Sequence, residues 1–164
     1  MHTRAVPITN QNWNRMFDKH TSKTRDIGLL IIRTGLGIGF IYYHGWGKLM
    51  GGMERWEGLG GSMERFGISF WPTFWGFMAS FAESIGALFI LLGIFTVPMS
   101  LLLAITMLVA WTGHIASGQG SPAHAFKNML VALGLVFMGA GRYSLDALIA
   151  RRRAAAEADE TGRP

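Results

Sequence analysis

Four stretches of the chain are almost continuously apolar, and none contains more than one charged residue. They cover residues 27–46, 75–95, 98–117 and 123–141. A helix needs about 20 residues to cross the hydrocarbon core of a bilayer, because each residue adds ~1.5 Å to its length. Helices of globular proteins average only ~11–12 residues and carry a polar face, which these stretches lack. The pattern therefore predicts an all-α fold, a transmembrane four-helix bundle in a lipid bilayer.

Polar segments lie on both sides of this apolar region. Residues 1–26 are polar and basic and lack the apolar core of a cleavable signal peptide, so we expect the first span to direct insertion. Residues 147–164 are first basic and then acidic, which predicts a partly disordered cytoplasmic tail. We therefore divide the chain into an N-terminal cytoplasmic segment (1–26), a membrane domain (27–146) and a tail (147–164).

The distribution of basic residues predicts the orientation. The chain has 15 Lys+Arg and 10 Asp+Glu, a net charge of +5. Ten of the basic residues lie before the first span or after the fourth: Arg4, Arg15, Lys19, Lys23, Arg25, Arg142, Arg151, Arg152, Arg153 and Arg163. Because basic residues mark the cytoplasmic ends of spans, we expect both termini in the cytoplasm. The net charge is then a topology signal and does not indicate a nucleic-acid site.

The sequence contains no Cys. This excludes disulfide relays, thiolate nucleophiles and metal or iron–sulfur centres held by Cys. A redox role would therefore need an external cofactor or a partner protein.

Arg33 and Glu83 are the two charged residues deep inside the predicted spans. A charge there costs at least ~2.5–3.5 kcal/mol unless it is paired or hydrated. Their opposite signs and similar depths predict an ion pair between the first two spans. One interpretation is a structural salt bridge that fixes helix register. The other is that Glu83 accepts protons and Arg33 orients it or an anionic ligand.

One face of the first span carries further candidate residues. Helical spacing places Gly37, Phe40, His44 and Lys48 on the same stripe as Arg33. The Gly-xxx-Gly spacing in 35–39 would let a second helix approach closely.

Three histidines are expected near the external side of the membrane: His44, His114 and His124. They could hold a metal ion, donate hydrogen bonds and protons to a quinone carbonyl, or be ordinary membrane-edge residues. We favour no metal site.

The segment between the first two spans mixes aromatic and charged residues. It contains a short internal echo, in which Gly52-Met53-Glu54-Arg55-Trp56 resembles Ser62-Met63-Glu64-Arg65-Phe66. This composition predicts a segment that lies in the membrane interface, and a lid over a site is the alternative.

Several motifs together resemble one known family. They are Arg33-Thr34-Gly35, Tyr43-His44-Gly45-Trp46-Gly47-Lys48, Glu83-Ser84-Ile85-Gly86-Ala87, Leu91-Leu92-Gly93, His114, and the closing Gly139-Ala140-Gly141-Arg142-Tyr143-Ser144-Leu145-Asp146. In this order, over roughly residues 25–150, they resemble the DoxX family of small four-span membrane proteins. The closing motif also fits a plain helix exit in which Ser144 caps the tail helix.

The resemblance implies a multi-pass protein of the prokaryotic cytoplasmic (inner) membrane. The family takes its name from a relative in a thiosulfate:quinone oxidoreductase, and other members look like membrane partners of redox proteins. It therefore implies a quinone link and gives no substrate. Family members often carry an acidic residue near the start of the fourth span, where this chain has His124 and Lys127. That departure would suit a different, anionic ligand.

Two functions follow from the sequence. The first is a quinone-linked redox subunit that acts with a partner oxidoreductase. In it Glu83 handles protons, Arg33 orients Glu83, and the quinone head group is bound by His44, Lys48 and His114. The alternative is a non-catalytic accessory or anchoring subunit of a larger membrane complex. Enzymatic activity and homo-oligomerisation stay open. A cavity that reaches Glu83 would favour the first function, and a tightly packed interior would favour the second.

Overall fold

The computed structural model describes the backbone of residues 10–162 and the side chains of residues 22–159 and 162. Within this part of the chain every regular element is a helix. The α-helices are α1 (Asn10–Phe40), α2 (Trp46–Leu49), α3 (Gly52–Gly60), α4 (Pro72–Phe81), α5 (Ala87–Leu92), α6 (Thr96–Ser117), α7 (Pro122–Met138) and α8 (Leu145–Thr161). Short π-helical turns join α1 to α2 (Ile41–Gly45) and α4 to α5 (Ala82–Gly86), and a 3₁₀ segment, Gly61–Phe66, follows α3.

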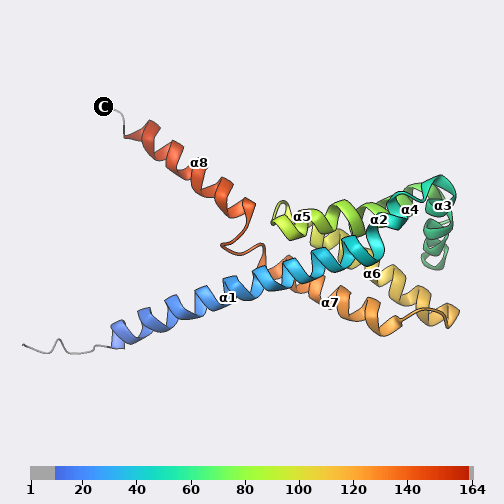
Figure 1. The fold of residues 1–164 in the computed structure, drawn as a ribbon, viewed down its shortest axis with the longest axis horizontal. Helices are drawn as coiled ribbons and strands as arrows, with labels where there is room; N and C mark the ends of the chain where they lie inside the picture. The colour runs from blue at the N-terminus through green and yellow to red at the C-terminus, as the bar shows by residue number, and fades with distance from the viewer. Residues whose placement is uncertain (1–9, 163–164) are drawn as a thin grey trace, which may run out of the picture.

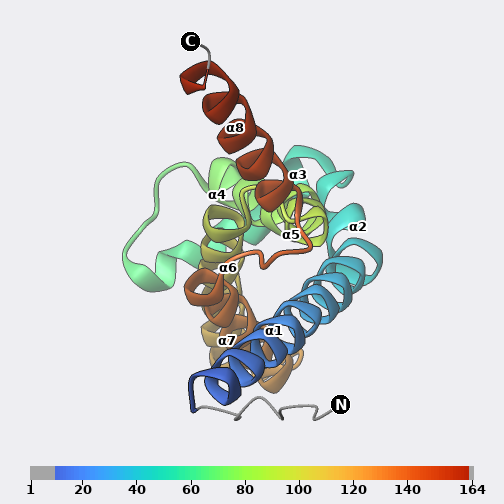
Figure 2. The ribbon, with the colours of Figure 1, turned by 90° about the vertical axis from the view of Figure 1, so that its left-hand side faces the viewer.

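Four apolar helical runs, α1–α2, α4–α5, α6 and α7, form the helical body (Figure 1). α3 covers one end of it. The first half of α1 and the whole of α8 project from the opposite end (Figure 1), where they diverge from each other (Figure 2).

Three of these runs are long and apolar enough to cross a membrane: Ser22–Leu49, Pro72–Leu92 and Thr96–Ser117. The fourth, Pro122–Met138, has 17 residues, the lower end of the range for a spanning helix. The all-α prediction and the membrane helices are confirmed. The fourth crossing and the cytoplasmic placement of both termini stay predictions.

The distribution of side chains also fits a lipid environment. Several polar side chains are buried in the helical body: Asp26, Arg33, Ser80, Glu83, Ser84, Thr96, Ser100 and Thr106. Large apolar side chains point outward, including Ile31 at 65% exposed and Phe137 at 87%. A water-soluble protein seldom exposes so much apolar surface. The outer surface of the helical body therefore matches hydrocarbon.

The helix boundaries differ from the predicted spans. α1 begins at Asn10, so part of the polar segment 1–26 is helical. The start of α6 is capped by Asp146, whose carboxylate accepts hydrogen bonds from the backbone nitrogens of Phe95 and Thr96. α8 continues to Thr161 where disorder was predicted, because its Ala- and Arg-rich sequence has high helix propensity. Ser144 caps α8 as predicted, by accepting from the nitrogen of Ala147 at 3.1 Å.

The close approach predicted for the first span occurs between α1 and α5. A Cβ at Gly37 would lie 2.6 Å from Cβ of Leu91 and 2.9 Å from the oxygen of Ala87. A Cβ added at Gly35 or at Gly39 would have no neighbour within 4 Å. The contact therefore depends on Gly37 and does not use the Gly-xxx-Gly pair.

Candidate functional site

Glu83 forms an ion pair with Lys48. Nζ of Lys48 lies 2.7 Å from Oε1 and 2.6 Å from Oε2 of Glu83, so the ammonium group contacts both carboxylate oxygens. The side chain of Glu83 is only 3% exposed, and that of Lys48 is 23% exposed. Burial strengthens the attraction because little water screens the two charges. The sequence placed both residues at a candidate site but did not pair them.

Two π-helical turns bring these residues together. Glu83 lies in the turn Ala82–Gly86, and Lys48 lies in α2, which follows the turn Ile41–Gly45 directly. The turns pack against each other at Gly45, where a Cβ would overlap the carbonyl oxygen of Glu83 and lie 2.7 Å from Cα of Ser84. Only glycine fits such an approach. π-Turns inside α-helices occur frequently at functional sites, and here two of them position one ion pair.

A cavity of about 510 Å³ reaches this ion pair. It lies between α4 and α6, and its walls are apolar side chains such as Met78 and Val109. Phe74 and Ile105 also line it, and they are 48% and 50% exposed on the outer surface. The cavity therefore opens sideways, on a surface that faces lipid when the helices span a membrane.

α3 and the 3₁₀ segment Gly61–Phe66 close the cavity at the end of the helical body. Leu59 and Met63 from these elements line it. α3 lies directly against α4, because a Cβ at Gly60 would overlap the oxygen of Pro72 and a Cβ at Gly76 would overlap the oxygen of Trp56. The segment between the first two spans thus covers the cavity, which agrees with the alternative reading of it as a lid.

Two further polar side chains line the cavity, Arg65 and His114. The guanidinium of Arg65 extends from the 3₁₀ segment to α6, where a Cβ at Gly113 would lie 2.9 Å from its Nη1. Nδ1 of His114 lies 2.9 Å from the backbone oxygen of Gln119. If Nδ1 carries the proton, Nε2 is left as an acceptor. The cavity therefore combines one ion pair, one arginine and one imidazole with apolar walls.

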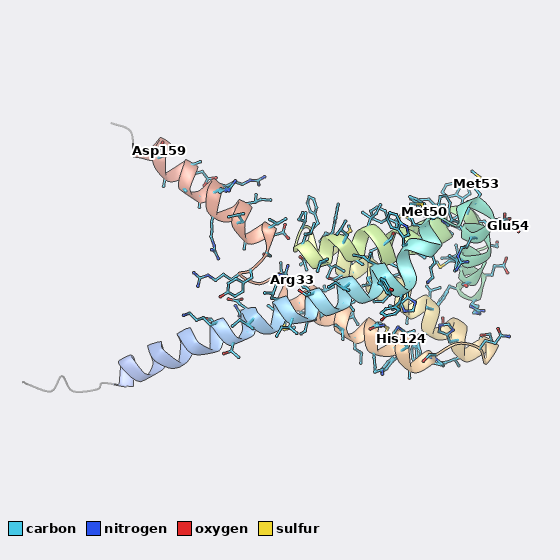
Figure 3. All side chains as sticks on the ribbon, viewed as in Figure 1. Arg33, Met50, Met53, Glu54, His124 and Asp159 are labelled. Atoms are coloured by element: carbon cyan, nitrogen blue, oxygen red, sulfur yellow. The ribbon has the colours of Figure 1, made fainter. Side chains whose placement is uncertain are left out.

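Arg33 lies in a different place from Glu83, so the predicted Arg33–Glu83 ion pair is wrong. Arg33 is fully buried, and its Nη2 donates to the backbone oxygen of Tyr143 at 2.5 Å. Its Nη1 lies against Gly93, which ends α5. Glu83 lies ten residues before Gly93 along the same helical run, a separation of roughly 15 Å. Figure 3 shows Arg33 near the connection to α8.

Arg33 belongs to a junction that joins the end of α5 to the start of α8. Asp146 is close enough to attract the guanidinium electrostatically, and its backbone nitrogen donates to the oxygen of Gly93 at 2.9 Å. Nε and Nη1 of Arg33 have no hydrogen-bond partner among the described residues. The junction gathers three motifs of the sequence: Arg33, Gly93 and the segment that ends at Asp146.

His44 does not line the cavity, although it lies close enough to Glu83 and Lys48 to interact electrostatically with both. Its ring packs 5.6 Å from Phe40 and 5.1 Å from His124, measured between ring centroids. Nε2 of His124 lies 2.9 Å from Nδ2 of Asn128, and Figure 3 shows His124 on α7. The three histidines thus separate into a pair and a single residue. In the described part of the chain, no three His, Asp or Glu side chains could hold a metal ion together.

Of the five residues predicted for the site, the cavity includes Glu83, Lys48 and His114. Sequence reasoning missed Arg65 and the apolar walls. The internal echo offered a signal, since it places Arg55 and Arg65 at equivalent positions. It could not show that Arg65 lines the cavity and Arg55 does not, although both side chains are exposed.

The outward apolar surface, the spanning helices and the buried polar residues define an integral membrane protein. The DoxX family model matches residues 28–115, which is more than half of the chain. The protein therefore belongs to the DoxX family. The matched residues include the Lys48–Glu83 ion pair and His114, whereas the motif 139–146 lies beyond them. No curated protein and no solved structure matches the chain.

Proposed function

We propose that this DoxX protein is a quinone-linked redox subunit, which binds the head group of a quinone in the cavity beside Lys48 and Glu83. The observation that carries the proposal is a mostly apolar cavity, open towards lipid, that ends at a buried ion pair. The chain contains no Cys, so a partner oxidoreductase supplies the electrons.

The residues present fit a quinone. The cavity volume of about 510 Å³ falls within the ~300–1,000 Å³ of small-molecule sites. A quinone ring and the start of its tail are apolar and match walls such as Met78 and Val109. The two ring carbonyls need hydrogen-bond donors, which Arg65 and Lys48 can provide, whereas His114 donates from Nε2 only when its ring carries both protons.

A bound quinone would supply two-electron, two-proton chemistry. The protein's part is to bind the ring and to manage protons. The Lys48 ammonium can donate a hydrogen bond into the cavity, and the Glu83 carboxylate, 2.6–2.7 Å away, orients that ammonium. Arg65 can donate to a carbonyl oxygen without losing its own proton.

The cavity lies at the end of the helical body opposite to α8. Basic residues gather at the α8 end and before the first span, which supports a cytoplasmic location for that end. We therefore place the cavity near the external side of a prokaryotic inner membrane. A purely accessory role is less well supported, because the interior beside Glu83 is hollow.

The first test fills the cavity without touching the ion pair. Ala110 on α6 lines the cavity, whereas Ala116 on the same helix is exposed. We expect Ala110→Phe to abolish binding of a short-chain quinone analogue to the purified protein in detergent, and Ala116→Phe to leave it unchanged. Binding is measured by isothermal titration calorimetry. Equal binding by both variants would place the quinone elsewhere and overturn the proposal.

The second test concerns the partner. Mild-detergent purification of the full chain, followed by identification of bound proteins and extracted quinone, should recover both. In the same preparation, Glu83→Gln should retain the partner and lose quinone turnover. A lone chain without quinone contradicts the proposal.

A further inference from the structure

A second hollow lies at the other end of the helical body, between the end of α5 and the start of α8. This α5–α8 notch has a volume of about 320 Å³. Leu92 and Leu148 form its apolar wall, and Arg142, Arg151 and Tyr143 complete it. Nη2 of Arg151 donates to the backbone oxygen of Arg142 at 3.4 Å, and both arginines line the same hollow.

Among the described side chains, neither guanidinium group of the notch pairs with a carboxylate, and Asp146 and Asp26 contact backbone nitrogens and Arg25 instead. Asp146 accepts from the backbone nitrogens of Phe95 and Thr96. Asp26 accepts from the backbone nitrogen of Arg142 at 3.2 Å and lies 3.8 Å from Nη2 of Arg25. Among side chains 22–159, no ion pair involves Arg142 or Arg151.

The notch also lies at a defined depth. Leu92 is the last residue of a membrane-spanning run, and the motif that carries Arg142 and Tyr143 follows the end of α7. Lipid phosphates lie where hydrocarbon-spanning helices end, and Tyr is enriched at that level. A half-exposed Tyr143, at 47%, is typical of it.

We propose that the α5–α8 notch binds the phosphodiester head group of an anionic membrane phospholipid. The two guanidinium groups donate hydrogen bonds to the phosphate oxygens, because each guanidinium presents several N–H donors in one plane. The apolar wall of Leu92 and Leu148 contacts the start of an acyl chain. Basic pockets at the cytoplasmic ends of membrane helices bind such lipids in general. This site is independent of the quinone cavity and its ion pair.

The chain supplies a charge-matched control for the test. Arg152 and Arg153 lie on α8 beside Arg151 but do not line the notch. The full-length protein in neutral detergent is titrated with phosphatidylglycerol, and bound lipid is counted by native mass spectrometry. We expect Arg142→Gln and Arg151→Gln each to weaken binding about fivefold, which corresponds to ~1 kcal/mol. Arg152→Gln and Arg153→Gln should stay within about twofold of the unmodified protein.

Three results would overturn the proposal. Equal losses in all four variants would mean that the total positive charge of residues 142–153, and no particular site, binds the lipid. Equal binding of phosphatidylcholine would remove the role of the anionic head group. Competition by inorganic phosphate at the same concentration as the lipid would assign the notch to a free anion. Melting temperatures of the lipid-free variants show whether each one is folded.

Discussion

The ammonium group of Lys48 contacts both carboxylate oxygens of Glu83 where two π-helical turns meet. The contact joins the end of the first spanning run to the middle of the second. Because one partner is almost fully buried, the pair is sensitive to the loss of either member. Replacing both residues with apolar side chains should destabilise the protein less, because no buried charge is then left without a partner.

The first prediction separates these effects. Lys48→Met leaves the Glu83 carboxylate buried and unpaired, and we expect a loss of about 3–5 kcal/mol in the free energy of unfolding. The double variant Lys48→Met/Glu83→Leu should recover most of this loss. Unfolding of the purified protein in mixed micelles measures both. A single variant as stable as the unmodified protein would show that water hydrates Glu83.

The second prediction concerns the packing of the two π-turns. A Cβ at Gly45 would overlap the backbone of Glu83, whereas a Cβ at Gly47 would have no neighbour within 4 Å. We expect Gly45→Ala to destabilise the protein by about 1–3 kcal/mol and to weaken quinone binding, because the turns are pushed apart. Gly47→Ala should be neutral or slightly stabilising in its helix. Melting temperature and ligand titration report the two effects, and similar results for both alanines would contradict the packing argument.

The third prediction concerns the junction around Arg33. Gly93 has φ +71°, and a Cβ added there would meet Arg33 and Ser144. Gly118 has a similar φ of +65°, but a Cβ added there would have no neighbour within 4 Å. Gly118→Ala should cost only the conformational penalty of ~1–2 kcal/mol. Gly93→Ala should cost more, since the methyl group also displaces the Arg33 guanidinium. Faster proteolysis within α8 should accompany it. If the two alanines cost the same, Arg33 does not hold this junction.

The fourth prediction uses the internal echo of the sequence. Arg65 lines the cavity and its counterpart Arg55 does not, although both side chains are exposed. We expect Arg65→Gln to weaken binding of the quinone analogue about tenfold, the equivalent of ~1.4 kcal/mol. Arg55→Gln should have no effect on binding. Both variants should melt like the unmodified protein, and unchanged affinity of Arg65→Gln would remove it from the site.

The helices were predictable because a helix that spans a membrane needs a long run of apolar residues. Long apolar runs predicted α4–α5 and α6, and the runs differ from the observed helices only at their ends. Those ends depend on distant partners such as Asp146, which caps α6 from another part of the chain. A prediction made from one segment at a time cannot include a capping residue from another part of the chain.

The predicted pairing of Arg33 with Glu83 was wrong for a related reason. It assumed that residues near the middle of their spans share one depth. In the structure the π-turn that carries Glu83 packs against the turn just before α2, and Lys48 on α2 therefore reaches Glu83. Arg33 lies earlier, in α1, where its guanidinium contacts the α5–α8 connection. Arg65 was missed because hydrophobic periodicity does not predict how the segment between the spans folds back.

The backbone contact between α3 and α4 at Gly60 and Gly76 has a kinetic consequence. We expect α3 to move together with α4, so that the cover over the cavity does not open to water by itself. A ligand would then enter and leave through the lipid-facing side, where the lining residues Phe74 and Ile105 are half exposed. The relevant concentration is the mole fraction of the ligand in the membrane. Diluting a fixed amount of ligand with more lipid should lower occupancy, whereas adding buffer should not.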